Sequence, residues 1–289
     1  MSESSFHPNN IHKNGYDFEL LLKSNPNLKS FIISSQNNNQ TIDFSNPRAV
    51  KELNKSLLIQ HYNISKWGIP KGFLCPAIPS RADYIHYIAD LFENKEGLKG
   101  LDIGTGANCI YPILGTQIYD WSFVASDISD KSLSSAKTNL DHTPSLKKNI
   151  QLRQQKSARN IFTGLIQEDD KFDFTICNPP FHSCKEAAEK ENLKKYKNLK
   201  LENSDPLNFG GQSNELWCDG GELLFLKNMI RESQYFKEQC TWFTSLVSKK
   251  ENVRPLKVAL KKLGAKTVKV IPMTHGKKIS RILVWSFQK

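Results

Sequence analysis

The sequence contains no apolar run of about 18 residues and no apolar stretch close to its N-terminus. A membrane-spanning helix requires a run of roughly that length, and a secretory signal requires an apolar segment of its own. We therefore expect neither a transmembrane helix nor a secretory leader, and a cytoplasmic protein with no membrane partner.

Its six cysteines form no Cys-x-x-Cys pair and show no spacing with histidine that is typical of a metal site. Such pairs and spacings are the usual signatures of zinc sites and of redox motifs. We expect reduced thiols, as in most cytoplasmic proteins, and no bound metal.

Charge is abundant but unevenly placed. The 289 residues include 40 Lys and Arg against 29 Asp and Glu, a formal net charge of +11. Twelve of the basic residues and one acid, Glu251, lie from Lys249 onward, so this C-terminal segment carries the whole excess. A basic surface confined to one end is typical of a protein with a polyanionic partner. A lysine-rich face that only meets solvent is the alternative.

The first 79 residues lack the regular alternation of predicted strands and helices that the rest of the chain shows. A helix is predicted over 49–62, with Asn46 as its N-cap and Pro47 at its first position. We treat residues 1–79 as a partly helical N-terminal extension and residues 80–289 as the main domain. The segment before this helix could be disordered, or it could be an arm that contacts nucleic acid through His7, His12, Lys13 and Lys23.

Predicted strands and helices alternate in the main domain. A first helix, capped by Ser80, is predicted over 81–92, and others over 130–140, 220–236 and 254–263. The last two strands are joined by too few residues for a parallel crossover, so they must be antiparallel. The fold class is therefore α/β, Rossmann-like, with a seven-stranded, mostly parallel sheet and an antiparallel final strand, as in class I methyltransferases. The strands are expected at 100–103, 122–127, 150–153, 172–177, 241–247, 267–271 and 279–287.

A glycine turn follows the first of these strands. Asp102, Gly104 and Gly106 are the candidate cofactor-binding residues there, because glycines let the backbone approach a ligand closely. Cys109 stands where a dinucleotide-binding turn would have its third glycine. This disfavours a pyrophosphate ligand and is compatible with a phosphate-free cofactor such as S-adenosylmethionine. A purely structural turn is the alternative.

Asp127 ends the second strand, 25 residues after Asp102. A carboxylate at this place can bind both ribose hydroxyls of an adenosine. It could also simply cap the next helix, a role that Ser129 or Asp130 could share.

The turn Asn178-Pro179-Pro180-Phe181 follows the strand at 172–177. The prolines end the strand at the edge of the sheet where open α/β folds bind ligands. The Asn178 side-chain oxygen and the Pro179 carbonyl could accept both N–H groups of a planar amine, and Phe181 could stack on its ring. These four residues are the predicted catalytic turn. A turn without a catalytic role is one alternative, and general-base catalysis by His182 is another.

Two lysine-rich segments lie outside these motifs. Residues 185–200 could form a loop that covers the substrate or a solvated helix. The predicted RNA-binding residues are close to the last turn of the chain and could contact phosphate groups: Lys277, Lys278 and Arg281, with His275 nearby.

A series of short motifs occurs in order along the chain: 43–47 (DFSNP), 72–76 (GFLCP), 81–86 (RADYIH), 101–112 (LDIGTGANCIYP), 177–182 (CNPPFH), 207–212 (LNFGGQ), 215–218 (ELWC), 220–222 (GGE) and 242–248 (WFTSLVS). Through them the chain resembles the bacterial 23S rRNA adenine-N6 methyltransferases, the large-subunit methyltransferase F family. It is more distantly similar to the eukaryotic methyltransferase-like 16 proteins. The resemblance runs from about His7 to the C-terminus.

The resemblance implies S-adenosylmethionine-dependent N6-methylation of one adenine in 23S rRNA, at position 1618 in the usual rRNA numbering. The methyl group would pass directly to a flipped-out base held by the Asn-Pro-Pro-Phe turn. By matching position, the resemblance places Arg81, Gly104, Asp127 and Asn178 at or beside the cofactor. The partner would be 23S rRNA or a large-subunit assembly intermediate.

Other functions stay open on the residues alone. The same turn could serve a methyltransferase for guanine N2, for DNA adenine N6 or for a protein glutamine, although the basic C-terminal segment disfavours a protein amide. A non-catalytic RNA-binding protein of the same fold is the alternative from a different class.

Overall fold

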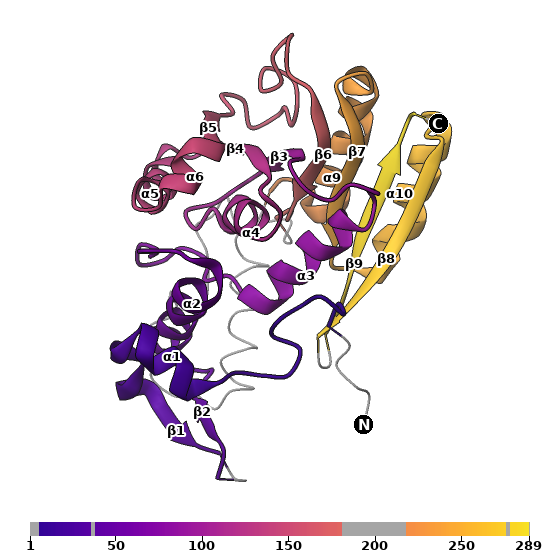
Figure 1. Cartoon of the computed structure of the whole chain (residues 1–289). Coiled ribbons are helices and arrows are strands. Elements are labelled where there is room, and N and C mark those ends of the chain that lie inside the picture. Colours follow the sequence, from indigo (N-terminus) through magenta and orange to yellow (C-terminus); the bar gives the residue numbers. More distant parts are fainter. Residues whose placement is uncertain (1–5, 36–37, 181–217, 276–277, 289) are drawn as a thin grey trace.

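The computed structural model of the chain describes residues 6–35, 38–180, 218–275 and 278–288 (Figure 1). One seven-stranded sheet has the order β5-β4-β3-β6-β7-β9-β8. The first five of these strands are parallel, and β9 is antiparallel to both of its neighbours. The predicted fold class is confirmed. The strands span Lys99–Ile103 (β3), Ser122–Asp127 (β4), Ile150–Gln154 (β5), Phe172–Cys177 (β6), Cys240–Val247 (β7), Thr267–His275 (β8) and Lys278–Ser286 (β9).

Helices cover both faces of the sheet because its residues alternate between two apolar clusters. Phe123 and Ala125 of β4 belong to one cluster, whereas Val124 between them belongs to the other. The first cluster includes α2 (Pro47–Tyr62), α3 (Ile78–Ala89) and α4 (Ile110–Tyr119), and the second includes α9 (Gly221–Ser233) and α10 (Lys250–Lys262). The other elements of the described chain are α1 (Phe18–Ser24), η1 (Pro26–Phe31), β1 (Ile32–Ser34), β2 (Gln40–Ile42), α5 (Asp130–Asp141), α6 (Pro144–Asn149) and η2 (Gln234–Phe236).

Local sequence signals placed α2 correctly and α3 less well. The Asn46 side chain accepts hydrogen bonds from the Arg48 and Ala49 N–H groups, and Pro47 opens the helix, as predicted. Ser80 does not cap α3: the helix begins at Ile78 with Ala77 as its N-cap. Pro79 fits within the first turn because backbone N–H groups there have no partner within the helix.

The N-terminal extension packs into the main domain. Leu53 and Leu57 of α2 lie in the same apolar cluster as Tyr84 of α3 and Leu114 of α4. In Figure 1 the α1 and α2 helices and the β1–β2 hairpin gather beside α3 and α4, in the lower left of the view. Because the two parts share one apolar cluster, the division near residue 79 remains a proposal that rests on the sequence alone.

The expectation that His7 and His12 face a nucleic acid is wrong. Both side chains are buried, 4% and 3% exposed. His7 Nε2 lies 2.9 Å from Asp90 Oδ2, and His12 Nε2 lies 2.8 Å from the Tyr62 hydroxyl. Burial, together with the neighbouring His61 and His86, lowers the pKa of His12 to about 4. These histidines fasten the N-terminal segment to α2 and α3.

Candidate active site

A cavity of about 770 Å³ opens at the carboxyl edge of the sheet, where β3 and β6 are neighbours. The strands that follow β3 lie first on one side of it (β4, β5) and then on the other (β6, β7). Open α/β sheets bind ligands at the point where the strand order changes side in this way. The lining residues are 103–106, 126–128 and 177–180 after β3, β4 and β6; Leu74, Pro76 and Arg81; Asn108, Ile110 and Tyr111; Gln155 and 158–161; and 218–219, Leu224, Phe225, Asn228 and Arg231.

The glycine turn has the backbone that its sequence predicts. Gly104 and Gly106 have φ angles of 74° and 63°, a region that suits glycine, and both line the cavity. The Gly104 and Thr105 N–H groups donate to the Ser126 carbonyl, which joins the turn to the end of β4. Cys109, at the place of the absent third glycine, also adopts a positive φ of 51° and is the N-cap residue of α4.

Asp127 lines the cavity and braces the glycine turn. Its Oδ2 accepts a hydrogen bond from the Gly106 N–H at 2.9 Å, and its Oδ1 accepts one from the Ser129 N–H at 2.8 Å. Burial raises the pKa of this carboxyl above its usual range. Ser129, not Asp127, caps the following helix α5. An ionised carboxylate has room for further donors besides these two.

Asp102 is the most strongly perturbed acid beside the cavity. The side chain is 1% exposed, and neither of its oxygens accepts a hydrogen bond within the described part of the chain. Burial, together with the nearby Asp127, raises its pKa to about 7 against the opposing effects of Thr105 and Arg81. The residue is not among those that line the cavity wall.

Arg81 reaches the cavity from the first turn of α3 and is held by Tyr111 of α4. Its Nη1 donates to the Tyr111 hydroxyl at 2.7 Å, and its guanidinium carbon lies 5.5 Å from the centre of the Tyr111 ring. Tyr84 packs edge-on against the same ring. The sequence signalled Arg81 but not Tyr111, because nothing in a single chain pairs two residues 30 positions apart.

Asn178 points a polar atom into this apolar setting. Its Oδ1 is buried and accepts no hydrogen bond from any residue that the structure describes. Asn178, Pro179 and Pro180 all line the cavity. A buried acceptor without a partner is costly in a folded protein, which makes this oxygen a candidate acceptor for a ligand donor. Phe181, His182 and residues 185–200 lie outside the described residues.

The loop between β5 and β6 forms the remaining wall, and two side chains shape it. Gln155 donates to the Ile161 and Thr163 carbonyls and accepts from the Ser157 N–H. The Glu232 carboxylate of α9, 7% exposed, accepts hydrogen bonds from the N–H groups of Ile161, Phe162 and Thr163 at 2.8–3.1 Å. Sequence reasoning missed both, since neither belongs to a motif.

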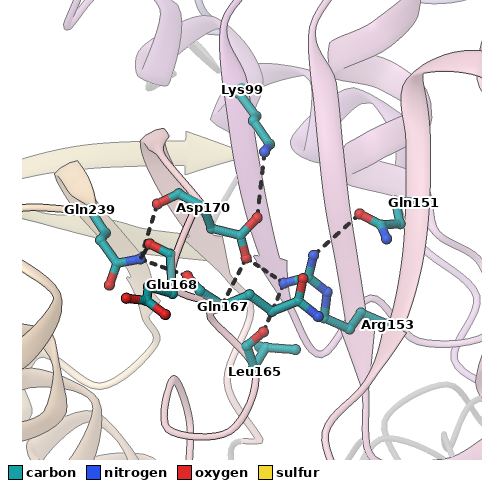
Figure 2. A network of polar contacts seen from close by, with 8 residues as sticks. All are labelled: Lys99, Gln151, Arg153, Leu165, Gln167, Glu168, Asp170 and Gln239. Carbon is teal, nitrogen blue, oxygen red and sulfur yellow. Dashed lines mark hydrogen bonds and ion pairs between the residues drawn. The ribbon is translucent and has the colours of Figure 1, made fainter.

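Side chains that do not line the cavity hold the other end of this loop in place (Figure 2). Asp170 lies between Arg153, which donates to its Oδ2, and Lys99, whose Nζ is 3.6 Å from its Oδ1. Gln239 donates to the carbonyls of Gln167, Glu168 and Asp170. The loop is thus fixed at both ends by side chains from distant segments.

Comparison with known proteins identifies the family. A family model described as RNA methyltransferase matches residues 1–289. The chain belongs to this family. "Ribosomal RNA large subunit methyltransferase F" of Christiangramia forsetii is 52% identical, with 97% of this chain and 99% of the relative covered. The relative of the same name from Shewanella sp. (strain MR-4) is also 52% identical, covering 97% and 81%.

Solved structures agree with the family. The hMettl16 catalytic domain in complex with the MAT2A 3'UTR hairpin 1 superposes with a TM-score of 0.83 at 29% identity, covering 99% of this chain and 96% of that one. The N-terminal domain of human METTL16 in complex with SAH gives 0.79 at 28% identity, covering 98% and 99%. The resemblance inferred from the sequence motifs is confirmed.

Arg281, one of the basic residues predicted to bind RNA, lies at the same edge of this methyltransferase's sheet. Arg281 pairs with Val247, the last residue of β7, so the β8–β9 tip extends beyond the edge that carries Asn178. Arg281 does not line the cavity, and Lys277 and the side chain of Lys278 lie outside the described part of the chain. Of the described helices, none is both long and apolar enough to cross a membrane.

Proposed function

We propose that this methyltransferase transfers the methyl group of S-adenosylmethionine to N6 of a specific adenine in 23S rRNA. The closely similar relatives named for large-subunit rRNA methylation support the substrate, and the SAH complex of a structural neighbour supports the cofactor. A cytoplasmic site of action, with 23S rRNA or an assembly intermediate as partner and no metal, belongs to the same proposal.

The residues around the cavity fit this cofactor. When bound, it supplies a sulfonium methyl group to the reaction. Arg81, oriented by Tyr111, is suited to the cofactor carboxylate. Buried Asp102 has no donor among the described residues and suits the ammonium group. Asp127 suits the ribose hydroxyls, and the Gly104–Gly106 turn gives the backbone room to approach.

The buried Asn178 Oδ1 is the single observation that carries the proposed chemistry. The exocyclic amine of adenine is a weak nucleophile because its lone pair is delocalised into the ring. Acceptors at Asn178 Oδ1 and the Pro179 carbonyl would hold its two N–H groups and direct the lone pair outward. Phe181 would stack on the flipped base. The proton can leave after transfer, so no strong base is required.

Replacing Asn178 by alanine tests this assignment. Asn178→Ala should bind SAH within about threefold of wild type in calorimetry, yet lose at least about a hundredfold in methyl transfer to a 23S rRNA transcript, as when other transition-state hydrogen-bonding groups are removed. Asn160→Ala, which changes another carboxamide of the same cavity, is the matched control and should keep most activity. Methyl transfer by Asn178→Ala at the wild-type rate would contradict the proposed role of Asn178 in holding the adenine amine.

A further inference from the structure

Three guanidinium groups line the cavity, more than the proposed cofactor can use. Arg81 donates to Tyr111 and is assigned to the cofactor carboxylate. S-adenosylmethionine carries no second anionic group, so Arg159 and Arg231 have no role in its binding. Their charges must face a different anion or water.

Arg159 and Arg231 come from two elements, and neither side chain has a partner among the residues that the structure describes. Arg159 lies in the loop between β5 and β6, and Arg231 lies in the last turns of α9; both side chains are exposed. Their backbones take part in hydrogen bonds, with the Ser157 hydroxyl and the Gln234 amide. Within the described residues, neither guanidinium donates a hydrogen bond or forms an ion pair. Each therefore presents its full set of donors at the cavity.

The Glu232 carboxylate joins the two elements that carry the arginines. Glu232 follows Arg231 directly, and its carboxylate accepts three backbone N–H groups from Ile161, Phe162 and Thr163. The first of these is two residues after Arg159. A charged acceptor with several N–H donors is a strong tie, so the loop that carries Arg159 is fixed against the helix that carries Arg231.

We propose that Arg159 and Arg231 form a phosphate-binding subsite for the RNA strand that flanks the target nucleotide. The inference rests on the proposed function, because it takes its substrate to be a polynucleotide. A base that is flipped into the cavity brings its own sugar-phosphate backbone to the cavity mouth. Guanidinium groups match phosphate oxygens in paired, planar hydrogen bonds, so two of them at the mouth suit this backbone.

Charge-removing variants with matched controls test the subsite. The test variants are Arg159→Gln, Arg231→Gln and the double variant. Lys156→Gln and Lys227→Gln are the controls, because these exposed lysines lie on the same loop and the same helix but do not line the cavity. The measurements are the salt dependence of binding to a 23S rRNA fragment, the KM for that fragment, and SAH affinity by calorimetry.

The slope of log Kd against log salt should fall by about 0.7 to 0.9 for each arginine removed. The KM of the double variant for RNA should rise about tenfold, with SAH affinity and kcat within twofold of wild type. Each control should change KM by less than twofold.

A wild-type salt slope and KM in the double variant would overturn the inference. So would weaker SAH binding with an unchanged RNA slope, which would assign the arginines to the cofactor. A wild-type protein that transfers no methyl group to 23S rRNA, whether as the fragment or within large-subunit particles, would contradict the proposed function instead. Direct binding would still decide whether the arginines contact RNA phosphate.

Discussion

Asp102 combines deep burial with an unsatisfied charge, which a stable fold would normally avoid. Both of its oxygens are without a hydrogen-bond donor in the described chain, and burial raises its pKa to about 7. Unfavourable features of this kind tend to persist at functional sites. The proposed role with the cofactor ammonium gives the carboxylate the partner that the protein alone does not supply.

Asp102→Asn should therefore make the protein more stable and less active. The carboxyl titrates near pH 3.8 in the unfolded chain and near 7 in the fold. Its penalty is absent below pH 3.8, grows as the pH rises to 7, and then reaches roughly 4 kcal/mol at most. In thermal unfolding the variant should gain several degrees at pH 8 and almost nothing at pH 4.

The same Asp102→Asn variant should bind SAH at least about tenfold more weakly, the cost of losing a charged partner. Calorimetry at pH 8 measures this directly. Undiminished SAH affinity, or a variant less stable than wild type at pH 8, would contradict the assignment.

Residues that belong to a motif could be predicted from the sequence, and their partners could not. Gly104, Gly106, Asp127 and Asn178 line one cavity and could be predicted because glycines, acids and prolines at strand ends have a local meaning. Arg81 lines the same cavity, but only the family resemblance indicated it. Tyr111, Gln155 and Glu232 act through contacts with distant segments. Tyr111 lies within the 101–112 motif, but nothing in that motif shows that it holds Arg81, and Gln155 and Glu232 belong to no motif.

At the scale of elements, the loop between β5 and β6 shows how tertiary contacts shape a binding wall. Glu232 fixes the end that lines the cavity, whereas Asp170 fixes the opposite end through Arg153, Lys99 and the Gln167 N–H (Figure 2). Both side chains are buried carboxylates that accept hydrogen bonds from charged side chains or backbone N–H groups. Glu232 holds the part of the loop that lines the cavity, whereas Asp170 holds a part that does not. Variants at the two positions can therefore distinguish an effect on stability from an effect on ligand binding.

Glu232→Gln and Asp170→Asn should destabilise the fold alike but affect the cofactor differently. Each loses a charge-assisted tie worth about 1–3 kcal/mol, so both should unfold at temperatures a few degrees lower. Glu232→Gln should also weaken SAH binding about fivefold because the cavity wall moves, whereas Asp170→Asn should stay within twofold. Equal SAH affinities in the two variants would show that the wall does not depend on Glu232.

Element boundaries were less predictable than element types. The strand at 267–271 was expected to end before Pro272, but β8 continues to His275. Proline is tolerated there because β8 is the edge strand of the sheet, where one side of the backbone needs no partner. Similarly, α10 begins at Lys250 and includes Pro255, whereas the predicted helix began at residue 254. Sequence patterns do not reveal which strand lies at an edge.

At the scale of the whole molecule, the fold gathers distant segments at one edge of the sheet. The cavity is lined by residues from Leu74 to Arg231, and the β8–β9 tip with Arg281 extends beyond the same edge. The alternation of strands and helices was enough to predict this arrangement, because it repeats along the chain. The packing of the N-terminal extension was not predictable: its polar sequence suggested exposure, yet His7, Asn10 and His12 are buried against α2 and α3.

The central claim is that this protein places one methyl group on N6 of one adenine in 23S rRNA. Mass-spectrometric mapping of that rRNA, from a strain that lacks the protein and from the same strain carrying wild type or Asn178→Ala, tests it most directly. We expect the mark to be absent from the deletion strain, restored at a single adenine by wild type, and absent with Asn178→Ala. A mark that persists in the deletion strain, or that Asn178→Ala restores in full, would contradict the account.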